Sequence, residues 1–244
     1  TRLFKPMSLL VVDDGSRAPG KFKKLLKDRT TVVYHGIDTN FYTPLVRPKN
    51  ILSRMGLNKD DFIIFSPHSL ITVKGVEYAI EAFGIFVNNC QINDAFLIIA
   101  GEGPLEQKLK HLANTMRLTD RVLFIGSIEH SKMPEYYALA DVVLATSASQ
   151  VYGNMNLVVQ EAMACGKPLL AFNTGNTSRI IVDGYNGLLA EPGDVLVLAS
   201  NFKKIYEDKK FGEEIGNNAR QFIIKNRSWE KRVRQELEVY ERIL

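Results

Sequence analysis

Short apolar runs alternate with longer amphipathic stretches along most of the chain. The apolar runs lack strict alternation of apolar and polar positions, which is typical of strands buried on both faces of a parallel sheet. Glycine, proline and small polar residues separate each run from the next amphipathic stretch. The expected strands are residues 7–12, 31–34, 62–65, 95–100, 122–125, 142–145, 169–172 and 187–189.

The stretches between the apolar runs have the spacing of helices. Val76, Ala79 and Ile80, for example, share one face of a helix over 76–88. The expected helices are residues 50–55, 76–88, 105–116 with Pro104 at the first turn, 133–140, 195–206, 211–226 and 229–244. A short basic amphipathic helix is expected over 21–27. Its basic face is either exposed to solvent or rests on anionic lipid. This order predicts an α/β fold with a doubly wound, Rossmann-like parallel sheet.

The stretch 152–168 is the most informative part of the chain. Its second half is apolar almost all round, which predicts a helix in the protein interior, and the strand 169–172 comes directly after it. Because Gly153 and Asn154 do not favour helix, we expect the helix to begin near Met155 or Asn156. The free N–H groups at such a helix start suit a phosphate group.

Glu161 lies inside this otherwise apolar helix. A carboxylate in such a place needs hydrogen-bond donors. Vicinal sugar hydroxyls would supply them, and the alternative is a glutamate at the rim of the helix that reaches water. The pattern alone leaves both open.

Ligands of parallel α/β sheets bind beyond the carboxyl ends of the strands, so the loops at these ends are the candidate sites. Lys74 stands at the mouth of a helix, where the dipole disfavours a cation. A bound anion would remove this conflict, and a solvated lysine is the alternative. His68, in the same loop, either donates to a phosphate or packs, with packing slightly favoured.

Three further loops contain glycine or small polar residues. The turn 101–104 lacks the third glycine and the downstream acid of a dinucleotide-binding fingerprint, which argues against NAD. We expect Gly103 to let a ligand approach the backbone, and a tight turn is the alternative. Gly126 is placed where the main chain could meet a planar base, although simple turn geometry explains it equally well. The segment 173–179 suits a hydroxyl-rich ligand.

Composition narrows the class of protein. The 244 residues suffice for one large domain or two small ones, and the net charge of +4 does not indicate a nucleic-acid binder. Cys90 and Cys165 are expected to be free thiols of a reducing compartment, and the sequence offers neither metal-ligand spacing nor a nucleophile set. No apolar run reaches the roughly 20 residues of a membrane span. A signal peptide is not recognisable, and because the chain begins with Thr we expect it to be a piece of a longer protein.

Eight short motifs occur along the chain. They are HGID at 35–38, VKG at 73–75, GEGP at 101–104, FIGSI at 124–128, ALAD at 138–141, EAMACGKP at 161–168, DGYNG at 183–187 and SWE at 228–230. In this order and spacing the series resembles the C-terminal, donor-binding half of the GT-B glycosyltransferases, most closely the retaining family 4 group. The resemblance covers roughly residues 31–244.

The resemblance implies roles for particular positions. Glu161 is similar to the glutamate that holds the ribose hydroxyls, and Lys74 to the lysine that binds the donor diphosphate; these two are the expected catalytic residues. The backbone of Ile125, Gly126 and Ile128 would meet the base. The other expected donor-binding positions are His68, Ser69, Gly103, Gly153, Asn154, Met155, Asn156, Leu157 and Arg179, with Asn156 and Leu157 offering backbone N–H groups.

The chain departs from the family pattern at three places. Gly153 stands where the family usually has its first glutamate, with Gln150 as the nearest polar side chain, and 153–158 is similar to the DGMNLV of trehalose-phosphate synthases with its acid replaced by glycine. His68 or Ser69 stands in place of the usual arginine. Arg179 stands where the family often has a glutamate. Its positive charge near the diphosphate would make up for the missing arginine.

The resemblance implies three parts: a remnant of an N-terminal acceptor domain and linker (1–38), a nucleotide-sugar-binding domain (39–228) and a crossover helix (229–244). The expected activity is retaining transfer of a hexose from a GDP- or UDP-linked donor to a glycan, lipid-linked or protein acceptor, with no metal or other cofactor. We expect the chain to need its acceptor domain or a partner subunit, and to be cytoplasmic with possible peripheral membrane contact. The alternatives are a non-catalytic nucleotide-sugar-binding module or donor subunit of a split enzyme, and an NAD-binding dehydrogenase domain.

Overall fold

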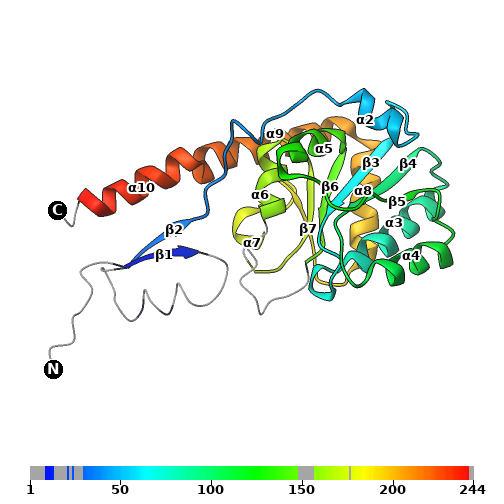
Figure 1. Cartoon of the computed structure of the whole chain (residues 1–244), viewed down its shortest axis with the longest axis horizontal. Helices are drawn as coiled ribbons and strands as arrows, with labels where there is room; N and C mark the ends of the chain where they lie inside the picture. Colours follow the sequence, from blue (N-terminus) through cyan, green and yellow to red (C-terminus); the bar gives the residue numbers. More distant parts are fainter. Residues whose placement is uncertain are drawn as a thin grey trace.

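The computed structural model describes residues 9–13, 21, 24, 30–147, 157–175 and 177–241. Its main body is a parallel sheet with the strand order β5-β4-β3-β6-β7-β8 (Figure 1). The strands are β3 (Phe62–Pro67), β4 (Ala95–Ala100), β5 (Val122–Phe124), β6 (Val142–Ala145), β7 (Leu169–Phe172) and β8 (Leu188–Ala190). The predicted doubly wound α/β fold is confirmed.

The sheet reverses its winding between β3 and β6. From β3 the chain builds outward through β4 to β5, then returns to place β6 on the other side of β3. The two central strands pair through Ile64 with Val142 and Phe65 with Val143. Such a switch point opens a crevice at the carboxyl ends of the two strands, which is where ligands of this class of fold bind.

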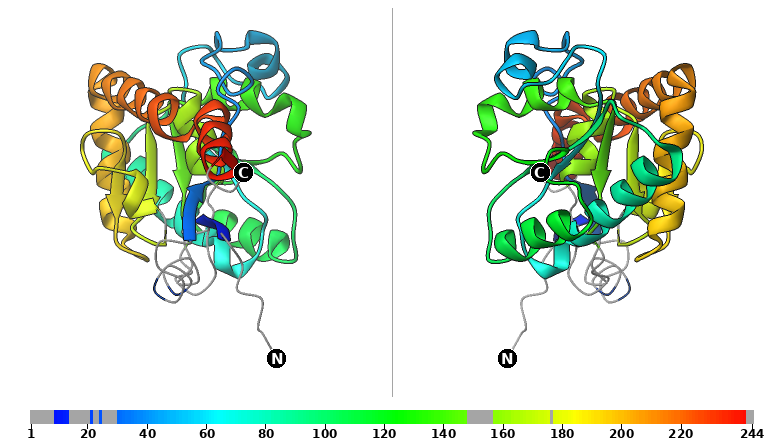
Figure 2. Two further views of the ribbon diagram at one scale, coloured as in Figure 1. Left: turned by 90° about the vertical axis from the view of Figure 1, so that its left-hand side faces the viewer. Right: turned by 90° about the vertical axis from the view of Figure 1, so that its right-hand side faces the viewer.

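Helices cover both faces of the sheet, as the two views of Figure 2 show. One face packs against α3 (Val76–Cys90), α4 (Glu106–Thr115) and α8 (Val195–Glu207); the other packs against α2 (Lys49–Arg54), α5 (Met133–Leu139), α6 (Leu157–Ala164) and α9 (Lys209–Arg227). Alternate residues of one strand serve different cores: Ile64 faces the first set of helices, whereas Ile63 and Phe65 face the second, and all three are fully buried. This two-sided burial explains why the strands are continuous apolar runs.

An arm extends from this body (Figure 1). It consists of β1 (Leu9–Asp13) and β2 (Thr30–Tyr34), which pair in parallel, and of α10 (Trp229–Glu241), which lies against β2. Arg232 of α10 donates a hydrogen bond of 2.7 Å to the carbonyl of Tyr34. Within the described residues, no helix is both long enough and apolar enough to cross a bilayer.

Two chain segments connect the arm to the body, and they cross side by side. Ile37 donates its N–H to the carbonyl of Arg227 at 2.8 Å, and the N–H of Trp229 donates to the carbonyl of Ile37 at 3.0 Å. Gly36 is required here because a Cβ would lie 2.6 Å from the Trp229 ring. The two crossings therefore form a single narrow connection.

The structure confirms all eight predicted strands, with β4, β6 and β7 at their predicted ends. Several bounds differ by one to three residues; in particular, Ile125 lies just after β5 and Pro104 precedes the first turn of α4. The short helix α7 (Thr177–Ile180) begins within the segment 173–179, where only a loop was expected. One helical turn is too short to produce an apolar repeat. The predicted start of α6 and the basic stretch 21–27, except for residues 21 and 24, lie outside the described residues.

Candidate functional site

Lys74 lies at the switch point, in the one-turn 3-10 helix η2 (Thr72–Lys74) that comes after β3. Its carbonyl accepts a hydrogen bond of 3.0 Å from the hydroxyl of Thr146, the residue after β6. Gly75 has φ +60°, and a Cβ there would lie 2.5 Å from the carbonyl oxygen of Thr146. The loops after the two central strands are therefore packed together, and this packing fixes the position of Lys74.

The Lys74 ammonium is half-buried, and burial lowers its pKa. Among the described carboxylates, none lies within 4.0 Å of its Nζ. A partly desolvated cation without such a counter-ion favours the binding of an anion.

His68 and Ser69 differ in exposure although they are neighbours. His68 is 4% exposed, between β3 and β6, where the backbone of Leu144 counts among the influences on its ring. Burial, with a smaller contribution from the Lys74 charge, lowers the pKa of His68 to about 3, so the imidazole is neutral at pH 7. Its Nε2 has no hydrogen-bond partner among the described residues. This geometry agrees with packing between β3 and β6, whereas Ser69 is exposed at the surface.

The glycines of the turn 101–104 have a packing role. A Cβ on Gly101 would collide with the carbonyl oxygen of His68, and one on Gly103 would collide with that of Leu70. The loops after β3 and β4 thus touch backbone to backbone. Gly103 is required by this contact whether or not a ligand lies beside it.

The segment proposed to meet a base comes after β5. Gly126 has φ +70°, and its carbonyl accepts a hydrogen bond of 2.8 Å from the N–H of Gly101. Ile125 and Ile128 pack against the core on the α5 and α6 side of the sheet. This loop is therefore held in a defined conformation next to the turn 101–104.

Glu161 is half-buried and faces a pocket of about 310 Å³. The pocket is lined by His35, Gly36, Ile37, Asp38, Phe41, Tyr42, His130, Leu157, Glu161 and Trp229. The phenol of Tyr137 donates a hydrogen bond of 2.7 Å to Glu161 Oε2. Glu161 is therefore directed into a pocket and is not turned outward into bulk water.

The predicted site residues fall into groups. Leu157 and Glu161 share the pocket, whereas Lys74, His68 and Ser69 lie together in the loop after β3. Arg179 is exposed on α7 and does not line the pocket. The predicted positions Gly153, Asn154, Met155 and Asn156, together with Gln150, lie outside the described residues.

Sequence reasoning missed the pocket residues Tyr42 and His130 and the buried phenol of Tyr137. The Tyr42 hydroxyl and His130 Nδ1 lie 3.3 Å apart, and the His130 ring stacks on Phe41 with centroids 5.5 Å apart. These aromatic residues come from the linker after β2, the loop after β5 and helix α5. No periodicity relates such positions, so no sequence signal could have grouped them.

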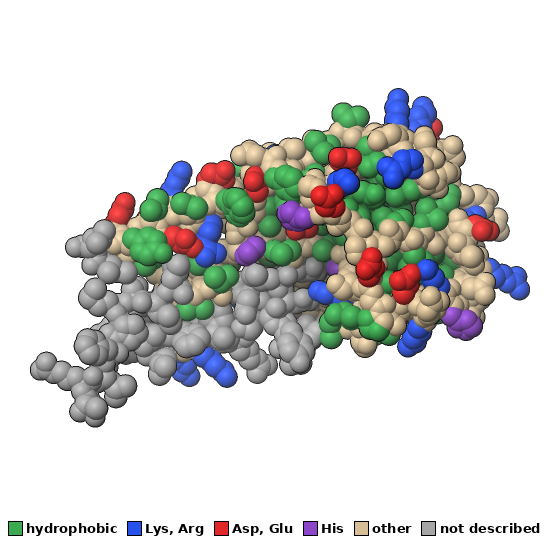
Figure 3. All heavy atoms as spheres, viewed as in Figure 1, with side chains coloured by type: hydrophobic (Ala, Val, Ile, Leu, Met, Phe, Trp, Pro, Cys, Tyr) green, Lys and Arg blue, Asp and Glu red, His purple; other side chains and the backbone are tan. Residues whose placement is uncertain are grey.

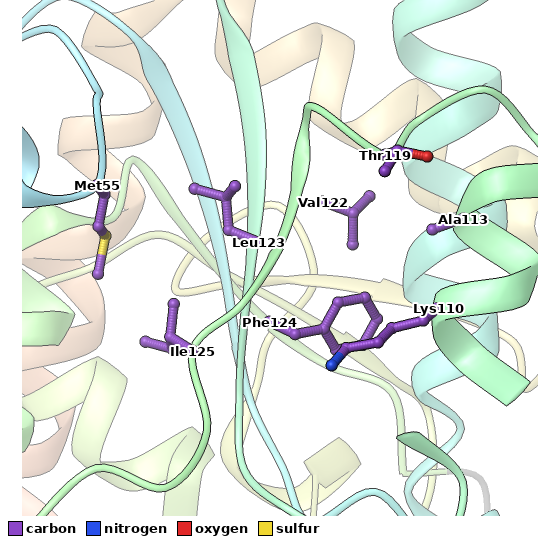
Figure 4. A pocket seen from close by; sticks show the side chains of 8 residues that line it. All are labelled: Met55, Lys110, Ala113, Thr119, Val122, Leu123, Phe124 and Ile125. Atoms are coloured by element: carbon purple, nitrogen blue, oxygen red, sulfur yellow. The ribbon is translucent and has the colours of Figure 1, made fainter. Parts of the chain in front are cut away.

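A second pocket, of about 420 Å³, surrounds the free edge of β5 (Figure 4). It is lined mainly by apolar side chains from both faces of the sheet, and its charged member, Lys110, pairs with Glu106 and lies 5.6 Å from the Phe124 ring centroid. Ile125 belongs to this pocket rather than to the one at Glu161. Because its described lining offers no carboxylate to a ligand, the pocket at Glu161 is the stronger candidate for a polar ligand.

Comparison with known proteins shows the family of the chain. The family model described as "Glycosyl transferases group 1" matches residues 49–222. The chain is 30% identical over 219 residues to N-acetyl-alpha-D-glucosaminyl L-malate synthase of Bacillus anthracis, covering 89% of this chain and 55% of that protein. It is 30% identical over 194 residues to D-inositol 3-phosphate glycosyltransferase of Paenarthrobacter aurescens, covering 79% and 47%. The chain thus spans about half the length of these curated relatives.

Solved structures show the same fold. The Anabaena protein Alr3699/HepE in complex with UDP superposes with a TM-score of 0.80 at 24% identity, over 97% of this chain and 63% of that chain. The C-terminal domain of a group 1 glycosyl transferase (LpcC) from Francisella tularensis gives a TM-score of 0.69 at 23% identity, over 80% of this chain and 100% of that chain. The chain belongs to the glycosyl transferases group 1 family and has the fold of a GT-B donor-binding domain.

Proposed function

We propose that this chain is the donor-binding half of a retaining hexosyltransferase that uses a nucleoside-diphosphate sugar. The observation that carries the proposal is the placement of Glu161 in a pocket. The chain belongs to this family, and its half-buried Lys74 lies at the switch point, where no described carboxylate pairs with it. The Anabaena protein of the same fold is described in complex with UDP and with UDP-glucose, which supports a uridine or similar nucleotide donor.

Each group has a chemical role in this proposal. Glu161 accepts hydrogen bonds from the ribose hydroxyls, and the backbone of 125–128 meets the base. Lys74 binds the diphosphate together with N–H groups near Asn156 and Leu157, with Ser69 and Arg179 as further donors. When the anomeric C–O bond breaks, negative charge develops on the departing diphosphate, and Lys74 stabilises that charge. The acceptor oxygen bonds to the same face of the anomeric carbon, and its proton passes to the diphosphate oxygen that leaves. The proposal includes no metal, because cationic side chains supply the charge.

The arm supports an assignment of domains. Trp229, Val233, Leu237 and Tyr240 form an apolar stripe along α10, each side chain between 52% and 56% exposed. Hydrophobic side chains gather over this helix in Figure 3. An exposed stripe of this length favours a protein partner. We propose that this stripe packs against the acceptor-binding half, for which the longer relatives have enough residues. Residues 39–228 are then the donor-binding body.

A donor-binding subunit without catalytic activity is the second candidate, and one sequence feature favours it. Gly153 stands where the family usually has a glutamate near the donor sugar. In that case nucleotide sugar binds, but no sugar is transferred even when the acceptor half is present.

Calorimetry tests the proposed function. UDP or GDP, and the corresponding sugar derivative, are expected to bind the 244-residue chain, and Glu161→Ala is expected to weaken binding at least about tenfold through lost ribose contacts. NADH is expected not to bind. If neither nucleotide binds, or if Glu161→Ala leaves their affinity unchanged, the proposed site is wrong. Transfer assays with the full-length protein then separate the enzyme from the inactive subunit.

A further inference from the structure

The Glu161 carboxylate is held by a buried phenol. Tyr137 is 0% exposed, and its hydroxyl donates to Glu161 Oε2 at 2.7 Å. Its ring otherwise contacts aromatic residues, with the centroid of Phe65 5.6 Å away and that of Tyr42 6.1 Å away. A buried phenol requires an acceptor, and here the acceptor is the proposed ribose-binding carboxylate.

A second phenol approaches the same carboxylate. The Glu161 charge lies close enough to raise the pKa of the Tyr42 phenol, after the larger effect of burial. The Tyr42 hydroxyl also lies 3.3 Å from His130 Nδ1, so Tyr42 is linked to the loop after β5. Tyr137 therefore donates to Glu161, and Tyr42 lies in the same pocket as this carboxylate.

The backbone that carries Tyr42 is itself fixed. Arg220 of α9 donates hydrogen bonds to the carbonyl of Tyr42 at 3.2 Å and to that of Ala164. The Asp38 carboxylate accepts from the N–H of Phe41 at 2.9 Å. The bond from Phe41 to Asp38 closes a turn within the segment 38–43, and Arg220 attaches this segment to α9 and to the end of α6.

The Glu161 carboxylate keeps hydrogen-bond acceptor sites for a ligand. An ionised carboxylate offers about four acceptor sites. The Tyr137 phenol occupies one of them, and the rest remain for donors in the pocket. Two adjacent hydroxyl groups match this remainder, and a carboxylate fixed in orientation binds them with less loss of side-chain entropy.

We propose that Tyr137, assisted by Tyr42, is a positioning residue that orients Glu161 toward the vicinal hydroxyls of the donor ribose. The inference rests on the proposed function and deepens it, because it explains how selectivity for a ribonucleotide arises. Neither tyrosine needs to touch the nucleotide for this role.

The test is the preference for a ribose over a deoxyribose. UDP, GDP and their 2′-deoxy forms are titrated by calorimetry into the wild-type chain and into Tyr137→Phe. The matched control is Tyr136→Phe, because Tyr136 is the neighbouring tyrosine of α5 and stacks on Phe65 at 6.4 Å, with no hydrogen bond from its hydroxyl to another described residue. We expect the wild type and Tyr136→Phe to bind the ribonucleotide about tenfold tighter than its 2′-deoxy form.

In Tyr137→Phe we expect this ratio to fall to about threefold or less, with a smaller loss of affinity for the 2′-deoxy nucleotide, which keeps only one of the two hydroxyls. The smaller loss for the 2′-deoxy form shows that the variant is folded and that the rest of the site is intact. If Tyr137→Phe does not fold, Tyr42→Phe provides the same measurement.

A ratio that stays at the wild-type value in a folded Tyr137→Phe variant refutes the positioning role and leaves the proposed function standing. Absence of nucleotide binding in the wild type refutes the proposed function itself. An equal loss of affinity for both nucleotides also refutes the inference, because it indicates general damage to the pocket.

Discussion

Replacing Lys74 by Met tests the diphosphate site most directly. The substitution removes one positive charge and keeps an unbranched apolar side chain of similar length. The Lys74 backbone remains anchored, because its carbonyl, rather than its side chain, accepts the hydrogen bond from Thr146. Since no described carboxylate pairs with the ammonium, the variant leaves no described anionic group unpaired.

The expected magnitude depends on the exposure of Lys74. The ammonium is only half-buried, so solvent screens it and the Coulomb energy of a dry interior does not apply. A charge-assisted hydrogen bond in such a place contributes about 1.5–3 kcal/mol, which corresponds to about 10- to 150-fold in the dissociation constant. The loss should appear only for ligands that carry phosphate.

The assay compares UDP and GDP with uridine and guanosine by calorimetry. Lys74→Met should weaken the binding of the diphosphates and leave the nucleosides unaffected. Lys210→Met, which removes the charge of an exposed lysine of α9, is the control for net charge. Equal diphosphate affinity in wild type and Lys74→Met would show that Lys74 does not bind the diphosphate.

The pH dependence of binding gives an independent check. Burial lowers the Lys74 pKa, so in the free protein the charged form is disfavoured relative to an ordinary lysine. A bound diphosphate favours the charged form and raises that pKa. Affinity should therefore be full below the pKa of the free protein and decrease as the pH rises through it, at a pH below the ordinary lysine value of 10.5. Lys74→Met should lack this decrease.

Three other substitutions test the fold. Gly101→Ala should lower the free energy of unfolding by at least about 2 kcal/mol, because φ is +137° and a Cβ meets the His68 carbonyl oxygen; an unchanged melting temperature would contradict this. Phe202→Ala should cost about 3–5 kcal/mol in urea unfolding, because the ring is fully buried, and a loss below about 1 kcal/mol would show that the core collapses around the gap. Arg220→Met should reduce stability by about 1–3 kcal/mol and also weaken nucleotide binding by releasing the Tyr42 segment, whereas a stability change alone would argue against that connection.

Much of the fold could be predicted from local patterns. The strands β4, β6 and β7 were predicted at their correct ends because strands buried on both faces leave no polar position inside the run. The helix α7 was missed because a single turn has no apolar repeat. Local patterns therefore predict elements that span the core, and fail for those that only shape a loop.

The candidate site was only partly predictable. Glu161 could be singled out because a carboxylate on a buried helix needs donors, but its partner Tyr137 looks like any core aromatic residue in the sequence. Gly103 shows another limit: the sequence left open a ligand or a tight turn at this glycine, and it gave no sign that the backbone of Leu70 packs against it. Contacts between residues far apart in the chain depend on the packing of whole elements, which no local pattern encodes.

The narrow connection at Ile37 has a consequence for any ligand of the pocket. Both crossing segments contribute walls to the pocket at Glu161, through residues 35–38 on one side and Trp229 on the other. A rotation of the arm about this pivot cannot leave the pocket unchanged. A ligand that binds more tightly in one orientation of the arm would therefore stabilise that orientation, by the same free energy with which the orientation strengthens its binding.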